Sequence, residues 1–269
     1  MRLQTLLYEA RLAKNCARWW KVLSTQRIHF RRADRWLKKS LAGYVLLDGD
    51  RRYANYARRD EVVYSIGRLT AGRARQALYQ GDVQKAERLL KTMAAIFSRF
   101  QLELPLSGFI PSALVISGHA FFVSGRYKIA EDKFGRLLTN QRSPLAPWGR
   151  YMRGWCRLRL KAFRKAVTDF EVLVRTGKGG KILQKAGIRD LVFAYTLAHK
   201  PGRAYRRFRR VVRGNTALLT AMIVALAARY AALGNKTAAI QLYRIALKRW
   251  HRDPRSSIWR SALKALQKP

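Results

Sequence analysis

Apolar positions along the chain recur every three to four residues in successive segments, and glycine and proline fall mostly between those segments. This is the period of an α-helix with one buried face, and the sequence has no strand-like alternation bounded by hairpin turns. The pattern therefore predicts an all-α protein. In five segments a turn is followed by a small residue and, four positions later, by a large apolar one. The small residues are Ala86, Ala130, Ala166, Ala204 and Ala239, and the large ones are Leu90, Phe134, Phe170, Phe208 and Tyr243.

The five alanines follow one another at spacings of 44, 36, 38 and 35 residues, with glycine turns at 81–82, 125–126 and 234–235. This arrangement resembles the tetratricopeptide repeat (TPR), a helix–turn–helix unit of about 34 residues. Lys161 and His199 stand where other units have the turn glycine. The first spacing is about ten residues too long for the repeat, and the extra length around residues 97–111 predicts a longer interhelix loop.

The resemblance implies an α-solenoid of about five TPR-like repeats over residues 61–255. A basic helical extension would precede it over residues 1–60, with helices at about 3–23 and 28–46, and a capping helix starting near Ser256 or Ser257 would close it over 256–269. In each pair the alanine would let two helices approach closely, and the larger residue would fill the groove between neighbouring pairs. Each alanine should therefore be buried. Helical repeats are general binding surfaces, so the resemblance leaves the function open.

Charge distinguishes this chain from a generic repeat protein. It has 56 lysines and arginines against 15 aspartates and glutamates, a formal net charge of +41, although 49% of its residues are hydrophobic. Self-repulsion on this scale destabilises a folded chain unless an anionic partner neutralises it. The excess is largest in residues 172–269, which contain 22 basic and 2 acidic residues. We therefore expect a folded body that binds an anion mainly through its last third.

Basic residues recur at helical spacing in three stripes, each expected opposite a buried apolar face. Neighbours on a stripe are about 5–6 Å apart, near the spacing of backbone phosphates, and arginine can contact a phosphate through two parallel bonds. The alternative is a solvated helix face, but such faces usually carry interleaved glutamates, and acids are almost absent here. The first stripe is Arg203, Arg206, Arg207, Arg210 and Arg213; the second is Arg244, Lys248, Arg252 and Arg255; the third is Arg150, Arg153 and Arg157.

Two further expectations concern single basic residues. Arg207 is expected on a free face, so Arg207→Ala should leave stability unchanged or raise it by relieving repulsion. Lys178 and Lys181 lie in a glycine-rich segment that could be taken for a phosphate-binding loop. The Walker pattern fails there because Arg175 and Ile182 occupy the places of its first glycine and its Ser or Thr. We therefore predict a flexible basic loop that contacts a phosphate backbone.

Catalytic and metal-binding patterns are absent from the sequence. The four histidines are scattered, and no nucleophile has an assignable base. Asp60-Glu61 and Glu131-Asp132 are each expected near the start of a helix, where the helix dipole favours acids. We therefore expect no enzymatic activity, no cofactor, no metal and no small-molecule substrate.

Four aromatic residues are interpreted as core and not as surfaces on which bases stack: Trp148, Trp155, Phe163 and Phe170. Three tryptophans outside the repeats stay open to either role: Trp19, Trp20 and Trp36.

The cysteines and the N-terminus bear on location. Cys16 and Cys156 are interpreted as buried thiols of a reducing intracellular compartment, the cytoplasm or an organelle matrix, with a disulfide as the alternative. Basic residues interrupt any secretory signal, and no uncharged apolar stretch reaches the roughly 20 residues of a membrane span; residues 216–228 are expected to form a buried helix. The first helix fits a membrane-surface helix, a transit peptide or an ordinary packed helix, although few serines and Glu9 argue against a transit peptide.

The leading functional prediction is a non-enzymatic, highly basic repeat protein that binds nucleic acid through its arginine stripes. RNA within a large ribonucleoprotein, such as a ribosome-like particle, is favoured over DNA, with other proteins of that complex as further partners. The alternative is a TPR scaffold that docks acidic protein partners in a multiprotein assembly, or an anionic membrane surface through residues 1–39.

Overall fold

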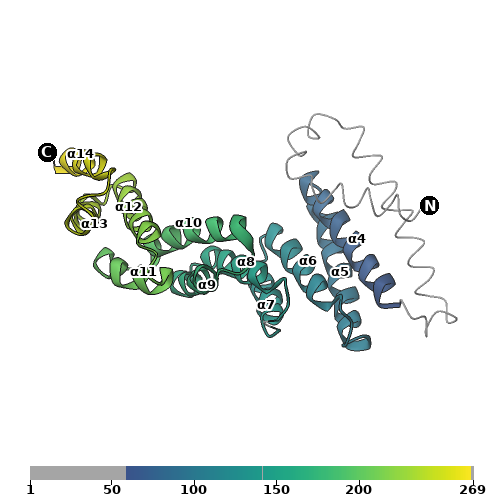
Figure 1. Ribbon diagram of the computed structural model, residues 1–269. Coiled ribbons are helices and arrows are strands. Elements are labelled where there is room, and N and C mark those ends of the chain that lie inside the picture. The colour runs from purple at the N-terminus through teal and green to yellow at the C-terminus, as the bar shows by residue number, and fades with distance from the viewer. Residues whose placement is uncertain (1–58, 141, 268–269) are drawn as a thin grey trace. The chain divides into compact units, whose positions relative to one another are not determined.

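The computed structural model describes residues 59–140 and 142–267, and in these residues helices are joined by short turns without any strand (Figure 1). The chain divides after Gly125 into two compact units. The predicted extension over residues 1–60 lies almost entirely outside the described part, as do Cys16 and the three N-terminal tryptophans. The domain boundaries proposed at residues 60 and 255 stay predictions.

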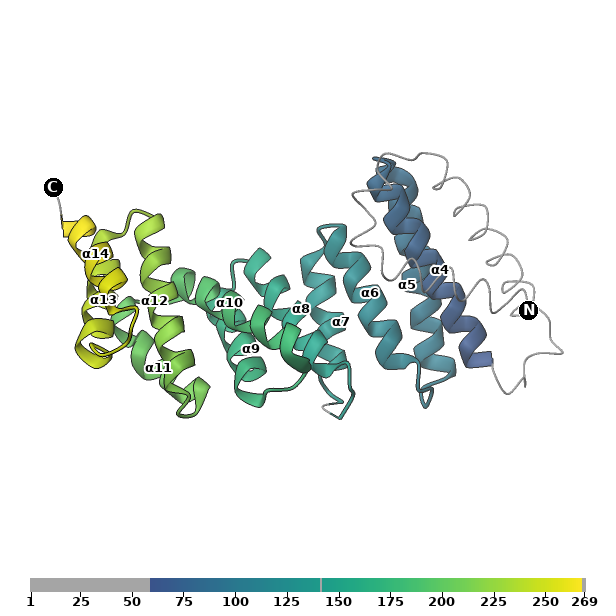
Figure 2. The same ribbon diagram turned by 45° about the horizontal axis from the view of Figure 1, so that its top comes forward.

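The first unit contains α4 (Arg59–Tyr79), α5 (Val83–Glu103) and α6 (Ile110–Val123). In both views α4 and α5 lie side by side along their length (Figure 2). A glycine permits this approach: a Cβ atom on Gly67 of α4 would lie 2.4 Å from the ring of Phe97 on α5. The turn ends at Asp82, whose carboxylate caps α5 by accepting from the backbone N–H of Lys85 at 3.0 Å.

The extra length of the first repeat is mostly helix, which corrects the predicted loop. α5 continues to Glu103, because Phe97 and Phe100 keep its apolar face buried, and only residues 104–109 connect it to α6. The acids at the start of α4 are placed as predicted, with Asp60 and Glu61 in its first turn.

The second unit contains eight α-helices and one 3-10 turn within its described residues. Along the sequence, α7, α8 and α9 each pack on the next helix, as do α11, α12 and α13, and α10 contacts α12. This arrangement confirms the all-α, TPR-like solenoid. The elements are α7 (Tyr127–Leu137), α8 (Ala146–Arg159), α9 (Phe163–Thr176), α10 (Gly180–Ala198), η2 (Pro201–Arg203), α11 (Ala204–Val212), α12 (Thr216–Ala232), α13 (Lys236–Arg249) and α14 (Ser256–Gln267).

The repeat residues lie in the core. All five predicted alanines have 0% exposure, and their large partners are 0–6% exposed. One of the large residues, Phe170, differs from expectation in where it packs. Phe170 of α9 contacts the first helix of its own pair, where a Cβ on Gly154 would lie 2.8 Å from its ring and Tyr151 and Trp155 contact it edge-on. A glycine on the first helix therefore accommodates the aromatic residue within the pair.

The turns between helices explain the two departures from the repeat pattern. Gly81, Gly125 and Gly234 all have left-handed backbone, with φ of 76–79°. Lys161 takes the same conformation at φ 59° without being glycine. His199 instead is extended, at φ −141°, and leads into the 3-10 turn η2. One missing glycine thus leaves a strained residue, and the other gives a different turn.

Two of the last three helices, α12 and α14, follow the sequence closely. Residues 216–228 lie in α12, whose buried face includes Leu219, Ile223 and Leu226. α14 runs from Ser256 to Gln267, as predicted for the capping helix, and buries Trp259 against the core. Among the described residues, no helix is both long and apolar enough to cross a membrane.

Candidate anion-binding surface

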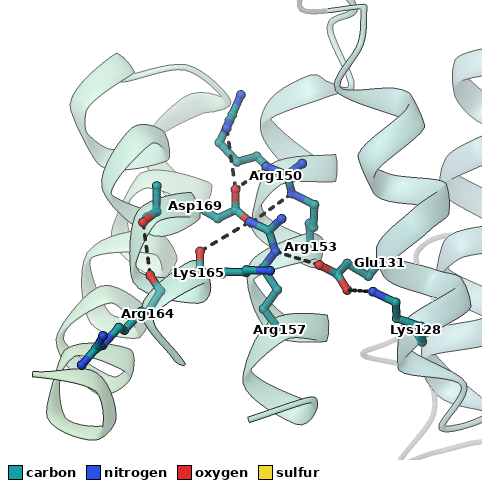
Figure 3. Close-up of polar contacts among 9 residues, drawn as sticks. Lys128, Glu131, Arg150, Arg153, Arg157, Arg164, Lys165 and Asp169 are labelled. Atoms are coloured by element: carbon teal, nitrogen blue, oxygen red, sulfur yellow. Dashed lines mark hydrogen bonds and ion pairs between the residues drawn. The ribbon is translucent and has the colours of Figure 1, made fainter. Parts of the chain in front are cut away.

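The third stripe converges on one buried carboxylate. Asp169 of α9 is 1% exposed, and the three arginines of α8 point toward it (Figure 3). Arg153 donates to both of its oxygens, from Nε at 3.0 Å and from Nη2 at 2.6 Å. Arg157 donates from Nη1 at 2.7 Å, and Arg150 forms a longer ion pair at 3.7 Å. The spacing that suggested a phosphate-binding face thus serves to clamp two adjacent helices.

Arg157 also ties α7 into this cluster. Its Nε donates to Glu131 at 2.9 Å, and Lys128 reaches the other oxygen of Glu131 at 3.3 Å (Figure 3). Burial acts to raise the pKa of Glu131, but the hydrogen bonds from Arg157 and Lys128 outweigh it and hold the pKa below its usual value. Glu131 lies in the middle of α7 and not in its first turn, so the dipole interpretation of this acid was wrong.

The structure therefore brings Arg150, Arg153 and Arg157 together but around internal acids. Their side chains are only 17–22% exposed, and Arg153 and Arg157 already donate to internal acids. Their binding to an external anion stays a prediction.

The first stripe contains one arginine with an internal role. Arg207 forms a two-bond contact with Glu171 of α9, with Nη2 to Oε2 at 2.9 Å, and its Nη1 lies 2.8 Å from Nε2 of His199. Because a guanidinium can only donate, Nε2 of His199 accepts this bond. Burial and the charge of Arg207 lower the pKa of His199. The premise that Arg207 lies on a free face was wrong. The other four members, Arg203, Arg206, Arg210 and Arg213, are exposed.

The second stripe is shorter than its spacing suggests. α13 ends at Arg249, so Arg244 and Lys248 lie on the helix while Arg252 and Arg255 lie in the following loop. Arg255 donates to both oxygens of Asp253 at 2.9 and 2.7 Å. This side-chain contact lowers the pKa of Asp253 to about 2. The sequence does indicate that the helix stops before Arg255, because Pro254 disfavours helix at the residue before it.

A cleft of about 600 Å³ opens between α11, the start of α12 and the end of α13. Its walls include Arg209, Lys248 and Arg249, together with Tyr205 and Trp250. The guanidinium of Arg249 lies over the ring of Tyr205, 3.9 Å from its centroid, and Nη1 donates to the tyrosine oxygen at 3.2 Å. Sequence reasoning missed Arg209, Arg249 and Tyr205, because contacts between α11 and α13 span about forty positions and leave no local pattern.

The glycine-rich segment between α9 and α10 follows a helix, which agrees with the failed Walker pattern. Lys178 lies in the loop and Lys181 in the first turn of α10, and both are exposed. The amide of Gln184 donates to the backbone oxygens of Leu173 and Lys178 at 3.0 and 2.8 Å. These two bonds hold the centre of the loop, whereas the sequence predicted a flexible loop.

A second cleft, of about 430 Å³, lies between α8 and α10 and is mainly apolar. Trp148, one of its walls, is 38% exposed, and Ile182 is 88% exposed, so the interpretation of Trp148 as core was wrong. Trp155 and Tyr151 are part-buried and donate to the buried carboxylate of Asp190 at 3.1 and 2.7 Å. Phe170 is fully buried as expected, and Phe163 is partly buried against the core.

No catalytic arrangement emerges from the described residues. They contain no cluster of three or more histidines, cysteines or acids that could hold a metal ion. Cys156 is buried, and burial is the main cause that raises the pKa of its thiol to about 12. A thiol with this pKa is a poor nucleophile at neutral pH.

No family model matches the chain, and no curated protein matches it. Solved structures to which it is similar include a putative kinesin light chain from Podosopora anserina with nearly identical TPR-like repeats, at 19% identity and a TM-score of 0.46. That match covers 66% of this chain and 92% of the other. BtubC (BKLC) from P. vanneervenii is 15% identical, with a TM-score of 0.47 over 87% of this chain and 94% of its own. These similarities concern the fold alone.

Proposed function

We propose that this chain is a non-enzymatic helical-repeat protein that binds RNA through the cationic surface of its second unit. The supporting observation is that the few acidic residues of this unit are paired with its own arginines. Residues 126–269 contain 34 basic and 6 acidic residues. Five of the six acids accept hydrogen bonds from arginines of the same unit. Most of the other cations therefore have no acid in the unit to balance them, and an external polyanion would do so.

Exposed cations of the second unit include seven members of the first and second stripes. They are the four arginines of the first stripe that remain exposed, Arg244 and Lys248 on α13, and Arg252 in the loop beyond it. A polyanion that binds such a surface releases condensed counterions, which favours association at low salt. RNA is favoured over duplex DNA because exposed planar groups, such as the guanidinium of Arg249, can stack on unpaired bases.

The proposal is tested by titrating the full-length chain into a fluorescently labelled single-stranded RNA and, separately, a polyglutamate chain of equal charge. Because guanidinium groups can both pair with phosphates and stack on bases, we expect tighter binding to RNA at every salt concentration. Purified protein should also carry nucleic acid, seen as a raised absorbance ratio that nuclease treatment removes. Equal affinity for RNA and polyglutamate would contradict RNA binding as the function.

The apolar cleft between α8 and α10 favours a second candidate function, the docking of a protein partner. Its exposed Trp148 and Ile182 could accept an apolar side chain, and the exposed Lys181 and Lys185 nearby on α10 could contact acidic residues beside it. An acidic peptide with one leucine should then bind the wild-type chain and lose affinity on Trp148→Ala. If Trp148→Ala leaves this affinity unchanged, the cleft is not the docking site.

A further inference from the structure

The cleft between α11, α12 and α13 combines a phosphate-binding wall with a stacking surface. Tyr205 and Arg209 are one turn apart on α11, and Lys248 and Arg249 are the last two basic residues of α13. The three cationic side chains are exposed, so each can reach a ligand in the cleft. No acid is among the residues that line it.

Arg249 is held in a fixed orientation. One face of its guanidinium covers the Tyr205 ring at 3.9 Å, and its bond to the tyrosine oxygen at 3.2 Å limits rotation of the group. Arg249 is nevertheless an exposed residue that lines the cleft, so a ligand there could approach the guanidinium from the side away from the ring. A planar cation fixed in this way is a surface on which a base can stack.

Electrostatics favour an anion in the same cleft. Arg209, Lys248 and Arg249 line one space of about 600 Å³, and like charges that are brought together destabilise each other. The acid closest to the cleft residues in sequence, Asp253, is already bonded to Arg255 by two hydrogen bonds. An incoming phosphate would meet three donors and no carboxylate from the lining residues.

From this arrangement we infer that the cleft binds one nucleotide of single-stranded RNA, its phosphate contacting Arg209 and Lys248 and its base stacked on Arg249. The inference rests on the proposed RNA-binding function and assigns a subsite within it. Base pairs of a duplex are stacked on one another and cannot lie flat on a side chain, so the strand must be unpaired here. Stacking accepts any base, so this subsite gives a preference for single strands without sequence specificity.

Two exposed arginines of the first stripe lie on α11 beside the residues of this subsite. Arg206 and Arg210 directly follow Tyr205 and Arg209 in sequence, which places them about 100° further around α11. A strand whose nucleotide occupies the cleft could therefore continue along the first stripe, with the following phosphates on its arginines.

The test uses the full chain and the variant Arg249→Lys, which keeps the charge but removes the planar group. Arg260→Lys, at an exposed position of α14, is the matched control. Two probes are titrated: a single-stranded RNA oligonucleotide, and inorganic polyphosphate with the same number of phosphates but no bases. We expect Arg249→Lys to weaken RNA binding roughly tenfold, in the range of one base-stacking contact. Its polyphosphate affinity, and both affinities of the control, should stay within about twofold of wild type.

The other outcomes separate the subsite from the wider function. If wild type binds RNA and Arg249→Lys binds it equally well, the subsite is wrong and the proposed function stands. If Arg249→Lys weakens both probes equally, the cleft contacts phosphate alone and the stacking inference is overturned. If wild type binds no RNA, the proposed function fails and the subsite with it. Lys248→Gln should weaken both probes, which checks the phosphate side independently.

Discussion

Asp169→Asn should destabilise the second unit strongly, although it adds only one unit of positive charge to a chain at +41. The carboxylate accepts three hydrogen bonds from Arg153 and Arg157 and is 1% exposed. Asparagine keeps one acceptor oxygen, turns an N–H₂ donor toward the guanidinium groups, and removes the charge that holds three arginines together. Removing one partner of a buried ion pair costs about 3–5 kcal/mol, because the other partner stays buried and unpaired.

The arginines here are 17–22% exposed, which allows some solvation and places the expected loss at the lower end, about 3 kcal/mol. The assay is urea denaturation followed by far-UV circular dichroism. Asp132→Asn is the matched control, since this exposed acid on α7 gives the same change in charge and should shift stability by less than about 0.5 kcal/mol. Equal losses in the two variants would refute the reasoning, because net charge alone would then explain both.

Three further predictions concern stability. Arg207→Ala should cost about 1–2 kcal/mol, because it strips Glu171 of its charged donor in a partly exposed setting, whereas Arg206→Ala should be near neutral; similar melting temperatures would contradict this. Ala239→Leu should cost about 1–3 kcal/mol by overpacking a site of 0% exposure, and Ala228→Leu on an exposed face should not, as urea midpoints would show. Lys161→Gly should stabilise the chain by about 0.5–1 kcal/mol, because glycine adopts the left-handed backbone at φ 59° without strain. Lys165→Gly within α9 should destabilise the chain, and a loss of stability in both variants would rule out strain at Lys161.

The fold could be predicted because its signals are local. An alanine followed four residues later by a large apolar residue marks one face of one helix, and all five alanines are buried where this pattern places them. Turn glycines likewise act through their own φ, as Gly81 and Gly234 do. Phe97 and Phe100 show the limit of this reasoning. The proline and glycine residues that follow them suggested a loop, but α5 continues to Glu103 because both rings are buried.

The use of the arginines could not be predicted, because it depends on contacts between helices. Arg153 is 16 residues from Asp169, and Arg207 is 36 residues from Glu171. Whether such pairs meet depends on the rotation of one helix against another, which helical spacing within a single segment does not determine. An arginine stripe opposite a buried face therefore looks the same in sequence whether it contacts solvent, a phosphate or a neighbouring helix. Scarce acids are the useful signal, since Asp169 and Glu171 within a basic region both have internal arginine partners.

The salt dependence of RNA binding tests the proposed surface most directly. The variant replaces the four exposed arginines of the first stripe with glutamine, at Arg203, Arg206, Arg210 and Arg213, and leaves the internal Arg207 intact. The control removes four exposed charges elsewhere, at Arg88, Lys91, Arg260 and Lys264. Each phosphate contact on a single strand contributes about 0.7 to the slope of log affinity against log salt, so the variant should flatten the slope by about 3 and the control should barely change it. Equal slopes in the folded variant and control would contradict RNA binding by the first stripe.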